Sequence, residues 1–510
     1  MTVPVLRITV VGVTAYTASQ LAPLLAGLDG PAVPLAKIEA ARVALLNRYR
    51  DDGFVLTAVT ATIDQQKTLT FHVTESHIAD VKLDGDIGPA GTLVLRMLRH
   101  LTETRPIDVA ALERWVLLVQ EIPGVTVNTV LRPSTAEPGA LTLIAQVHRN
   151  LFSALAVFDN AASKTTGPDE GLLVIDGNSF TQFGEKTEVS LYHTSGNTET
   201  FGQALEEFFV GSSGLRVRLY GGYGPTTPSA PFRDIGYYGT ATVFGVGATY
   251  PVIRRREQTL DAIVSFDGVD TRITTLSGLN DAREPLSKDS VRALRLGASY
   301  GVQDTLLGDT RAAANTVVFR VSQGLPILGA SSSPGSPGAR AGEAVSFTKL
   351  GAEISRTQTL FEPWGGASVA AVGLVAGQWS GDILPSVEQL YLGGLRLNPG
   401  YYSGEVTGDS GVGIYGELQL NDRWAVPLFG EPLDVAAQPF VFGSWGQTWN
   451  NTRAQPNVHI ASAGGGARLS LAPNAELDVI AAARFTRNIN GGDVARLGAD
   501  TVYWRLILRF

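Results

Sequence analysis

Residues 391–411 read YLGGLRLNPGYYSGEVTGDSG and stand between two segments in which apolar and polar residues alternate. Such alternation predicts β-strands, because successive side chains of a strand point to opposite faces. The stretch itself is rich in glycine and carries the paired tyrosines Tyr401 and Tyr402, so we expect a long ordered loop between the two strands. The fold then depends on the kind of sheet to which these strands belong.

Strand-like segments recur from residue 151 to the end of the chain, separated by clusters of Gly, Asn, Asp, Ser and Pro, and helical periodicity disappears. An even number of alternating strands fits a closed antiparallel barrel, because an open edge in lipid would leave backbone groups unpaired. We therefore predict a mostly β protein in which residues 151–510 form a 16-stranded antiparallel transmembrane β-barrel. The expected strands are 151–159, 171–181, 185–194, 199–210, 215–224, 237–252, 258–275, 290–304, 312–325, 346–360, 366–380, 411–421, 438–450, 462–473, 475–486 and 501–510.

The composition agrees with such a barrel. The chain has 510 residues, of which 57 are glycine and only 17% are charged. No run of 18 or more uninterrupted apolar residues occurs, which excludes a membrane-spanning helix. The net charge of -8 argues against a nucleic-acid partner, whose recognition needs a concentrated positive patch. The absence of cysteine is compatible with an oxidising compartment.

The last strand shows the alternation most clearly. Its apolar residues share one face, which we expect to meet lipid, and Arg505 and Arg509 share the other, which we expect to face the lumen. An ordinary edge strand that ends in phenylalanine is the alternative. The apolar row resembles the membrane-insertion signal of bacterial outer-membrane proteins and consists of Trp504, Leu506, Leu508 and Phe510.

The first 150 residues contain the same β-α-α-β-β order twice, over 1–76 and 77–150. In the second repeat a helix begins at the expected cap Asp108 and ends before Pro123 and Gly124. We expect residues 1–150 to be a soluble unit separable from the barrel, because both repeats carry apolar faces that look complete. Two generic α+β modules are the alternative interpretation.

No catalytic, metal-binding or cofactor-binding pattern is complete, so we predict no enzyme, no metal and no cofactor. The Asp409-Ser410 pair stands in a Gly-Asp-Ser-Gly run like that of serine proteases, but none of the six histidines lies in a recognisable base motif. His72 and His77 lack a third metal ligand nearby. The glycine run 464–466 lacks the Gly-Lys-Ser/Thr ending of a phosphate loop.

Both repeats resemble POTRA domains, and residues 391–411 resemble the pore loop of the outer-membrane barrels that carry them. In that family the loop has a Gly-Gly, a Val-Arg-Gly-Tyr and a Gly-Asp-x-Gly, and it folds back into the barrel. The resemblance therefore implies an inward-folding loop over residues 381–410. Asn398 and Pro399 stand where the family has valine and arginine. The matching residues are Gly393, Gly394, Gly400, Tyr401, Gly408, Asp409 and Gly411.

In the family the loop arginine pairs with an aspartate in a Phe-x-Asp-x-Gly motif of the barrel wall. The matching motif here is Phe442, Ser444 and Gly446, so both charged partners are replaced together. This is physically coherent, because a single buried charge left without its partner would cost several kcal/mol. Three alternatives stay open: Arg396 pairs with another acid or a carbonyl, the paired tyrosines Tyr401 and Tyr402 anchor the loop by packing, or the loop lies in solvent.

Taken together, the chain resembles the outer-membrane transporters of two-partner secretion, the haemolysin and filamentous haemagglutinin secretion/activation family (TpsB). The resemblance implies a location in the bacterial outer membrane with the N-terminal domains in the periplasm. It also implies capture of an unfolded, exported partner, large and β-helical, which crosses the lumen without ATP and folds outside. The other implied partners are the barrel-assembly machinery and outer-membrane lipid.

Two other functions are alternatives to secretion. A barrel-assembly insertase of the same superfamily usually carries more POTRA units, and a passive diffusion porin has no need of the N-terminal repeats. Neither a secretory leader nor the family's plug helix precedes the first repeat, so we expect Met1 to mark a processed or re-engineered start.

Overall fold

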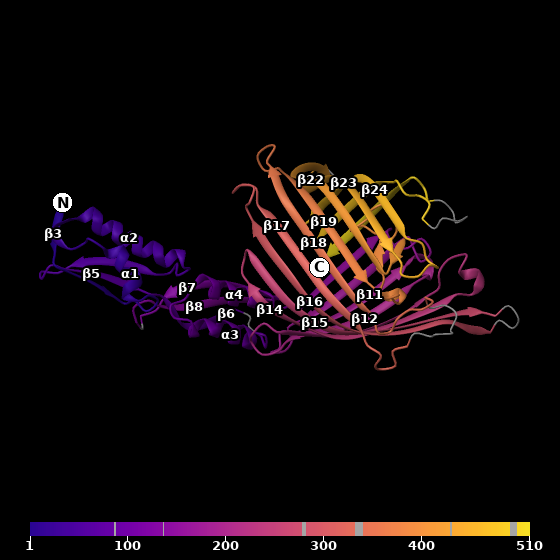
Figure 1. Cartoon of the computed structure of the whole chain (residues 1–510), viewed down its shortest axis with the longest axis horizontal. Helices are drawn as coiled ribbons and strands as arrows, with labels where there is room; N and C mark the ends of the chain where they lie inside the picture. Colours follow the sequence, from indigo (N-terminus) through magenta and orange to yellow (C-terminus); the bar gives the residue numbers. More distant parts are fainter. Residues whose placement is uncertain (86–87, 136, 278–281, 332–339, 429–430, 490–496) are drawn as a thin grey trace.

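Two small α/β units in tandem lead into a large β-barrel in the computed structural model of the chain (Figure 1). The structure describes residues 1–510 except 86–87, 136, 278–281, 332–339, 429–430 and 490–496. The first unit lies farthest from the barrel and the second unit lies at its rim (Figure 1). No helix in the described part of the chain is long and apolar enough to cross a membrane.

The first unit packs two helices on a three-stranded sheet in which β5 is central, parallel to β2 and antiparallel to β4. The alternating Leu69, Phe71 and Val73 of β5 are all buried, as a strand with one covered face requires. A separate two-stranded ribbon joins β1 and β3. The elements are β1 (Thr2–Val5), β2 (Arg7–Val11), α1 (Ala18–Leu25), β3 (Gly30–Pro34), α2 (Leu35–Asp51), β4 (Ala58–Ile63) and β5 (Thr68–Thr74).

Glu75, at the end of the first unit, ties three of its segments together. Its carboxylate accepts hydrogen bonds from the backbone N–H groups of Thr14, at 2.9 and 3.0 Å, and of Ala15, at 3.0 Å. It also accepts hydrogen bonds from the hydroxyls of Thr14 and of Tyr49, the latter at 2.6 Å. Burial raises the pKa of the Glu75 carboxyl, but these hydrogen bonds outweigh burial and hold the pKa below its ordinary value.

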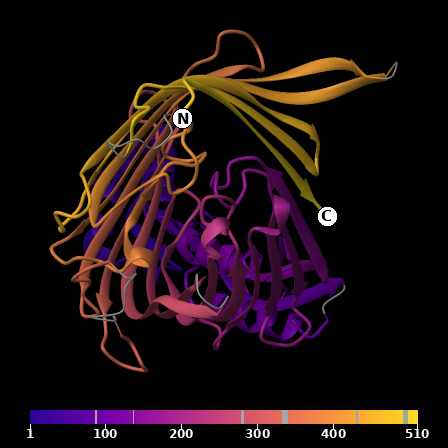
Figure 2. The same ribbon diagram turned by 90° about the vertical axis from the view of Figure 1, so that its right-hand side faces the viewer.

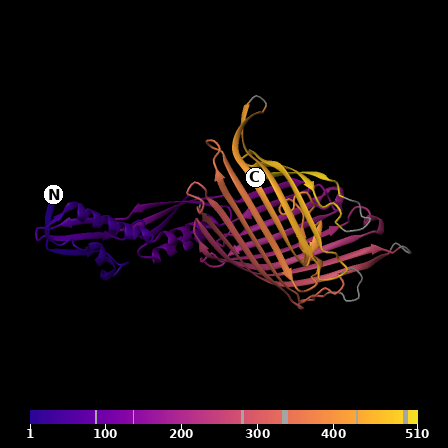
Figure 3. The same ribbon diagram turned by 45° about the horizontal axis from the view of Figure 1, so that its top comes forward.

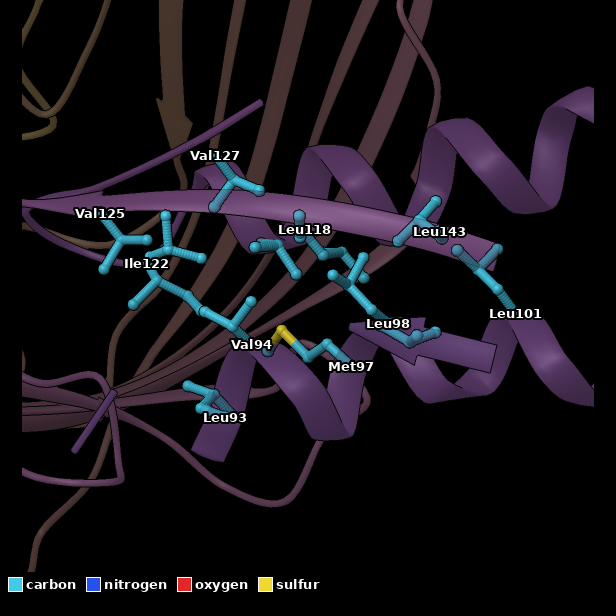
Figure 4. Close-up of a cluster of buried hydrophobic side chains, with 14 of the residues drawn as sticks. Leu93, Val94, Met97, Leu98, Leu101, Leu118, Ile122, Val125, Val127 and Leu143 are labelled. Atoms are coloured by element: carbon cyan, nitrogen blue, oxygen red, sulfur yellow. The ribbon is translucent and has the colours of Figure 1, made fainter. Parts of the chain in front are cut away.

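The second unit repeats the arrangement, with β8 central, parallel to β6 and antiparallel to β7. Asp108 caps its second helix as expected, because the carboxylate accepts the Ala111 backbone N–H at 2.6 Å. Figure 4 shows how the apolar faces of its helices meet the sheet in one buried cluster. The elements are β6 (His77–Gly85), α3 (Gly91–Arg99), η1 (His100–Glu103), α4 (Val109–Gln120), β7 (Val125–Pro133) and β8 (Ala140–Arg149).

The core of the second unit is not complete within its own sequence. Phe209, at the end of a barrel strand, is buried in the same cluster. Barrel turns also bind the unit: the Ser179 hydroxyl donates to the carbonyl of Pro123 at 2.5 Å, and the His100 ring lies 2.9 Å from the Ser212 hydroxyl. The barrel therefore covers part of the apolar face of the second unit, and the separability of residues 1–150 stays a prediction.

Sixteen antiparallel strands close into a barrel, which confirms the predicted fold class (Figure 2). The last strand pairs with the first barrel strand, with Arg505 opposite Asp159 and Arg509 opposite Leu155. The barrel strands are β9 (Phe152–Asp159), β10 (Glu170–Asn178), β11 (Lys186–Thr194), β12 (Thr200–Phe209), β13 (Arg216–Thr226), β14 (Tyr238–Arg254), β15 (Gln258–Leu276), β16 (Arg283–Asp304), β17 (Ala313–Gly324), β18 (Thr348–Phe361), β19 (Ser368–Ser380), β22 (Ser410–Leu428), β23 (Glu431–Trp449), β24 (Val458–Ala472), β25 (Ala475–Arg484) and β26 (Asp500–Arg509).

Alternation assigns the two faces of the barrel wall. Large apolar side chains stay exposed on the outer face, and their immediate neighbours, many of them polar or charged, point inward. An exposed apolar band of this kind is stable when it meets lipid. Its exposed members include Leu173, Leu191, Leu219, Val246, Val264, Leu296, Phe319, Ile354, Val375, Ile414, Val441, Val479 and Trp504.

Three strands run farther than the sequence predicts. β16 begins at Arg283 rather than near residue 290. β22 continues beyond residue 421 and β23 begins before residue 438, and the added parts form a projecting hairpin (Figure 3). Their ladder extends from Asp422 opposite Ala437 to Leu428 opposite Glu431, beyond the last pair that β22 makes with β19. Aspartates and prolines in this hairpin look like turn signals, yet a two-stranded ribbon tolerates proline because its edges need no partner.

Candidate functional site

The connection between β19 and β22 runs from residue 381 to 409 and forms a hairpin of its own. It contains η4 (Ser386–Glu388) and the short strands β20 (Leu390–Leu392) and β21 (Val406–Gly408), which pair antiparallel. Gly393 has φ 106° at the start of the tip, and a Cβ there would overlap the carbonyl oxygen of Tyr402. This position therefore requires glycine.

This hairpin lies against the inner face of the barrel wall. Its wall contacts include Tyr415, Phe442 and Tyr503, each of which is the immediate neighbour of an exposed, outward-facing residue. Side chains of adjacent strand residues point to opposite faces, so these contacts lie in the lumen. The buried loop members of the cluster are Leu392, Leu397, Tyr401 and Val406, and the buried wall members include Leu374, Ala376, Tyr415, Phe440, Phe442, Ile460, Ile480, Ala482 and Tyr503.

The tip of the loop is held mainly by Tyr401, which is fully buried. Its hydroxyl lies 2.7 Å from the carbonyl oxygen of Ala461 and 2.8 Å from that of Thr486. The neighbouring Tyr402 meets the ring of Tyr503 edge-on, with centroids 6.1 Å apart. Packing by the paired tyrosines, one of the three alternatives drawn from the sequence, is thus present in the structure.

Arg396 contributes less. It forms an ion pair with Glu353 on β18, but 66% of the Arg396 side chain is exposed. Exposed ion pairs contribute about 0–1 kcal/mol. The acid partner expected from the sequence exists, and its contribution to holding the loop is small.

Hydrogen bonds to loop carbonyls stand where the sequence lacks the expected ion pair, around Pro399 and Ser444. The Ser462 hydroxyl donates to the carbonyl of Pro399 and lies 2.7 Å from the hydroxyl of Ser444. The guanidinium of Arg484, which projects from β25, donates to the carbonyl of Gly400 and lies 5.6 Å from the ring of Tyr402. The barrel wall therefore supplies the cation and the loop supplies the acceptor.

Phe442 and Gly446 of the wall motif also contact this region. The Phe442 ring stacks on Tyr415 with centroids 5.8 Å apart. A Cβ at Gly446 would lie 2.8 Å from Leu392 and 3.0 Å from the side chain of Asn398, so glycine makes room for the loop. Asn398 is fully buried, and neither amide atom of its side chain has a hydrogen-bond partner in the described part of the chain.

Two buried carboxylates fix the base of the loop. Asp409 pairs with Arg340, and it accepts the backbone N–H groups of Leu384 at 2.9 Å and Asn451 at 2.8 Å. Arg340 belongs to the connection between β17 and β18, so two connections are joined by this pair. Gly408 and Gly411, on either side of this region, leave no space for a Cβ: it would lie 2.6 Å from Thr448 and 2.7 Å from the carbonyl of Gln447, respectively.

Glu388 fixes the loop from another side. Its side chain is 2% exposed, and its oxygens lie 2.5 Å from an Arg295 nitrogen and 2.6 Å from the Lys349 nitrogen. Arg295 also binds Asp267 at 2.8 Å. The loop is thus joined by charged side chains to β15, β16 and β18.

The apolar row of the last strand faces outward as expected from the alternation. Trp504 is 39% exposed and Phe510 is 69% exposed, while Arg505 pairs with Asp478 at 2.6 Å on the inner face. Leu506 and Leu508 share the outward face with these two residues. The backbone of Phe510 exchanges two hydrogen bonds with Ala154, at 2.8 and 3.0 Å, and so takes part in closing the barrel.

Four residues of the site escaped the sequence analysis: Arg340, Glu388, Arg295 and Arg484. Each lies outside the motifs, and the pairs Arg340–Asp409, Glu388–Arg295 and Arg484–Gly400 span 69, 93 and 84 positions. For Arg295 and Arg484 the available signal was a charged residue at an inward position of a strand, whereas Arg340 and Glu388 lie in connections, where alternation gives no signal. The described residues contain no cluster of three side chains that could hold a metal ion.

Comparison with known proteins identifies the family. The profile "Haemolysin secretion/activation protein ShlB/FhaC/HecB" matches residues 142–469, and the profile "POTRA domain, ShlB-type" matches residues 3–76. Among curated proteins none matches the chain.

Solved structures support the fold. CdiB from Escherichia coli is 18% identical with a TM-score of 0.76, over 100% of this chain and 91% of that chain. CdiB from Acinetobacter baumannii is 14% identical with a TM-score of 0.66, over 100% and 90%. BamA from Haemophilus ducreyi lacking POTRA domains 1–3 is 12% identical with a TM-score of 0.51, over 100% of both chains.

Proposed function

The chain belongs to the ShlB/FhaC/HecB family of haemolysin secretion/activation proteins, and from this premise we propose how its parts carry out secretion. It is an outer-membrane transporter of two-partner secretion and not an enzyme, and its partner is a secreted exoprotein. Its N-terminal POTRA domains lie in the periplasm. The steps of capture, passage and control are our proposal.

We assign residues 1–76 and 77–150 to two POTRA units, 151–510 to the barrel and 381–410 to a loop that controls passage. The units take up the unfolded partner. Their three-stranded sheets have edge strands, β2 and β4 in the first and β6 and β7 in the second. An extended chain can add to such an edge through backbone hydrogen bonds, which do not depend on its sequence.

The observation that carries the proposal is the packing of residues 381–409 on the lumen wall. Tyr401, Glu388 and Asp409 hold the loop at three separate places, all of them buried. A polypeptide that crosses this lumen must displace at least the tip. The partner crosses without ATP, and its folding outside makes return unfavourable. We infer from the family resemblance that the partner is large and β-helical.

The remaining partners follow from the barrel surface. Outer-membrane lipid covers the exposed apolar band, and the barrel-assembly machinery inserts the chain by reading Trp504, Leu506, Leu508 and Phe510. The fold shared with BamA keeps a barrel-assembly insertase as the second candidate. Under that alternative, loss of the chain would lower the amounts of other barrels in the membrane.

Co-expression with the secreted protein encoded in a neighbouring reading frame tests the proposal. We expect that protein in the medium only when the chain is present, and cell-associated when residues 381–410 are deleted. A chain that leaves the candidate partner inside but restores other outer-membrane barrels would be an insertase. A chain that changes neither, yet conducts small solutes freely, would be a porin.

A further inference from the structure

A cavity of about 620 Å³ opens on the inner face of the barrel beside the loop. It is lined mainly by inward-facing residues of β12 to β18, and by Val387 and Glu388 of the loop. Its lining contains five basic and three acidic side chains, which leaves two positive charges in excess. In a narrow lumen with low-dielectric walls, such an excess is screened less than at an open surface.

Glu388 indicates what this cavity binds. It is a carboxylate from a different segment, and it is buried against both Arg295 and Lys349, at 2.5 and 2.6 Å. A charge-assisted contact of this kind is shorter and stronger than a neutral hydrogen bond. One end of the cavity is therefore already a carboxylate site, filled from within the chain.

The lining carries two further arginines, one on β13 and one on β17, the strand between those that bear Arg295 and Lys349. Arg218 and Arg320 line the cavity, and within the part of the chain that the structure describes no carboxylate forms an ion pair with either. Arg218 instead lies over the ring of Tyr220, with its guanidinium carbon 5.5 Å from the ring centroid. That arrangement positions the guanidinium and leaves its N–H donors for a ligand.

We propose that the cavity is a carboxylate-binding site in the lumen which holds acidic side chains of the polypeptide in transit. Arg218 and Arg320 bind the carboxylates that enter. This inference rests on the proposed function and names the chemistry that the lumen recognises in its substrate. Glu388 fills the second place while the loop is folded. An acidic segment in the cavity competes with Glu388 for Arg295 and Lys349, and so loosens the loop at this anchor.

The test uses the full chain in planar lipid bilayers and a peptide of about ten glutamates as probe, added on the side of the N-terminal units. We expect the peptide to block the current, and a lysine peptide of equal length to leave it unchanged. Arg218→Gln with Arg320→Gln should weaken the block at least about tenfold, since hydrogen bonds to charged groups have that magnitude. Replacing both by lysine should restore most of the block.

Arg99→Gln is the matched control, because Arg99 is an exposed arginine of α3 outside the barrel. It should leave the block unchanged. Heat-modifiable migration shows that each variant is folded, and the single Arg320→Gln serves if the double variant is not. Equal block by both peptides, or full block of the folded glutamine variants, would overturn the site. The block is measured without the partner, so failure of the carboxylate site leaves the secretion function standing. Absence of secretion by the unaltered chain would instead contradict the secretion function itself.

Discussion

Replacing Tyr401 by alanine tests how the loop is held. The side chain is fully buried in the lumen, and its hydroxyl contacts two carbonyl oxygens, that of Ala461 on β24 and that of Thr486 just after β25. The substitution removes these contacts and leaves the hydrogen-bond ladder of the barrel intact. We therefore expect the loop tip to leave the wall while the barrel stays folded.

The size of the effect follows from burial. Truncating a buried aromatic side chain to alanine costs about 3–5 kcal/mol. Because each 1.4 kcal/mol corresponds to about a factor of ten, the population with a free tip should rise by roughly two to four orders of magnitude. Tyr401→Phe keeps the ring and loses only the hydroxyl, so about 1 kcal/mol and roughly a fivefold rise are expected.

Current recordings in planar bilayers measure the free-tip population as open time, and secretion of the partner measures directed transport. Open time should increase in the order Tyr401→Phe, then Tyr401→Ala, while secretion falls. Tyr391→Ala is the matched control: it is a tyrosine of the same loop, it is 47% exposed, and its hydroxyl donates to the carbonyl of Ser386 within that loop. It should change neither readout by more than about twofold.

Normal conductance and normal secretion in a correctly folded Tyr401→Ala protein would refute the reasoning. So would an effect of equal size in Tyr391→Ala, because exposure would then not matter. Heat-modifiable migration on a gel separates these outcomes from a failure to fold.

Four further predictions follow from other parts of the chain. Pro399→Arg or Ser444→Asp alone should destabilise the protein by about 3 kcal/mol by burying an unpaired charge, whereas the double variant should recover part of that loss in a double-mutant cycle of denaturant unfolding. Asn398→Val removes two buried polar atoms without partners and should stabilise by about 1–2 kcal/mol in the same measurement; destabilisation would mean that the amide is satisfied. Deleting Phe510 removes a lipid-facing side chain and two hydrogen bonds to Ala154, so the heat-modifiable band in outer membranes should weaken, and an unchanged band would contradict the insertion signal. Folding lowers the pKa of Glu75, so the stability that its carboxylate contributes is complete above the ordinary pKa near 4.5 and is lost as pH falls through the lowered value. The difference in protease resistance between the unaltered chain and Glu75→Gln should therefore be large at about pH 7 and vanish in acid. A difference that does not depend on pH would exclude the carboxylate as its source.

The sequence predicted the fold closely because strand faces are a local property. Alternation alone places Trp504 outward and Arg505 inward, and sixteen such segments in lipid must close on themselves. Strand ends were less predictable where a turn-like residue stands inside a ladder, as in the β22–β23 hairpin. The boundary after residue 150 looked complete because the sequence does not show that Phe209 enters the core of the second unit.

For the site, the sequence by itself determined which residues are available to the loop: the glycines that permit its turn at Gly393, the paired tyrosines Tyr401 and Tyr402, and the absence of a charged pair at Pro399 and Ser444. Only the tertiary structure decided what holds that loop. Arg484 meets Gly400 across 84 positions, and Glu388 meets Arg295 across 93. Contacts of this length depend on the register and closure of the whole barrel, which bring inward-facing side chains of distant strands to one place, and no local pattern encodes which of them will meet.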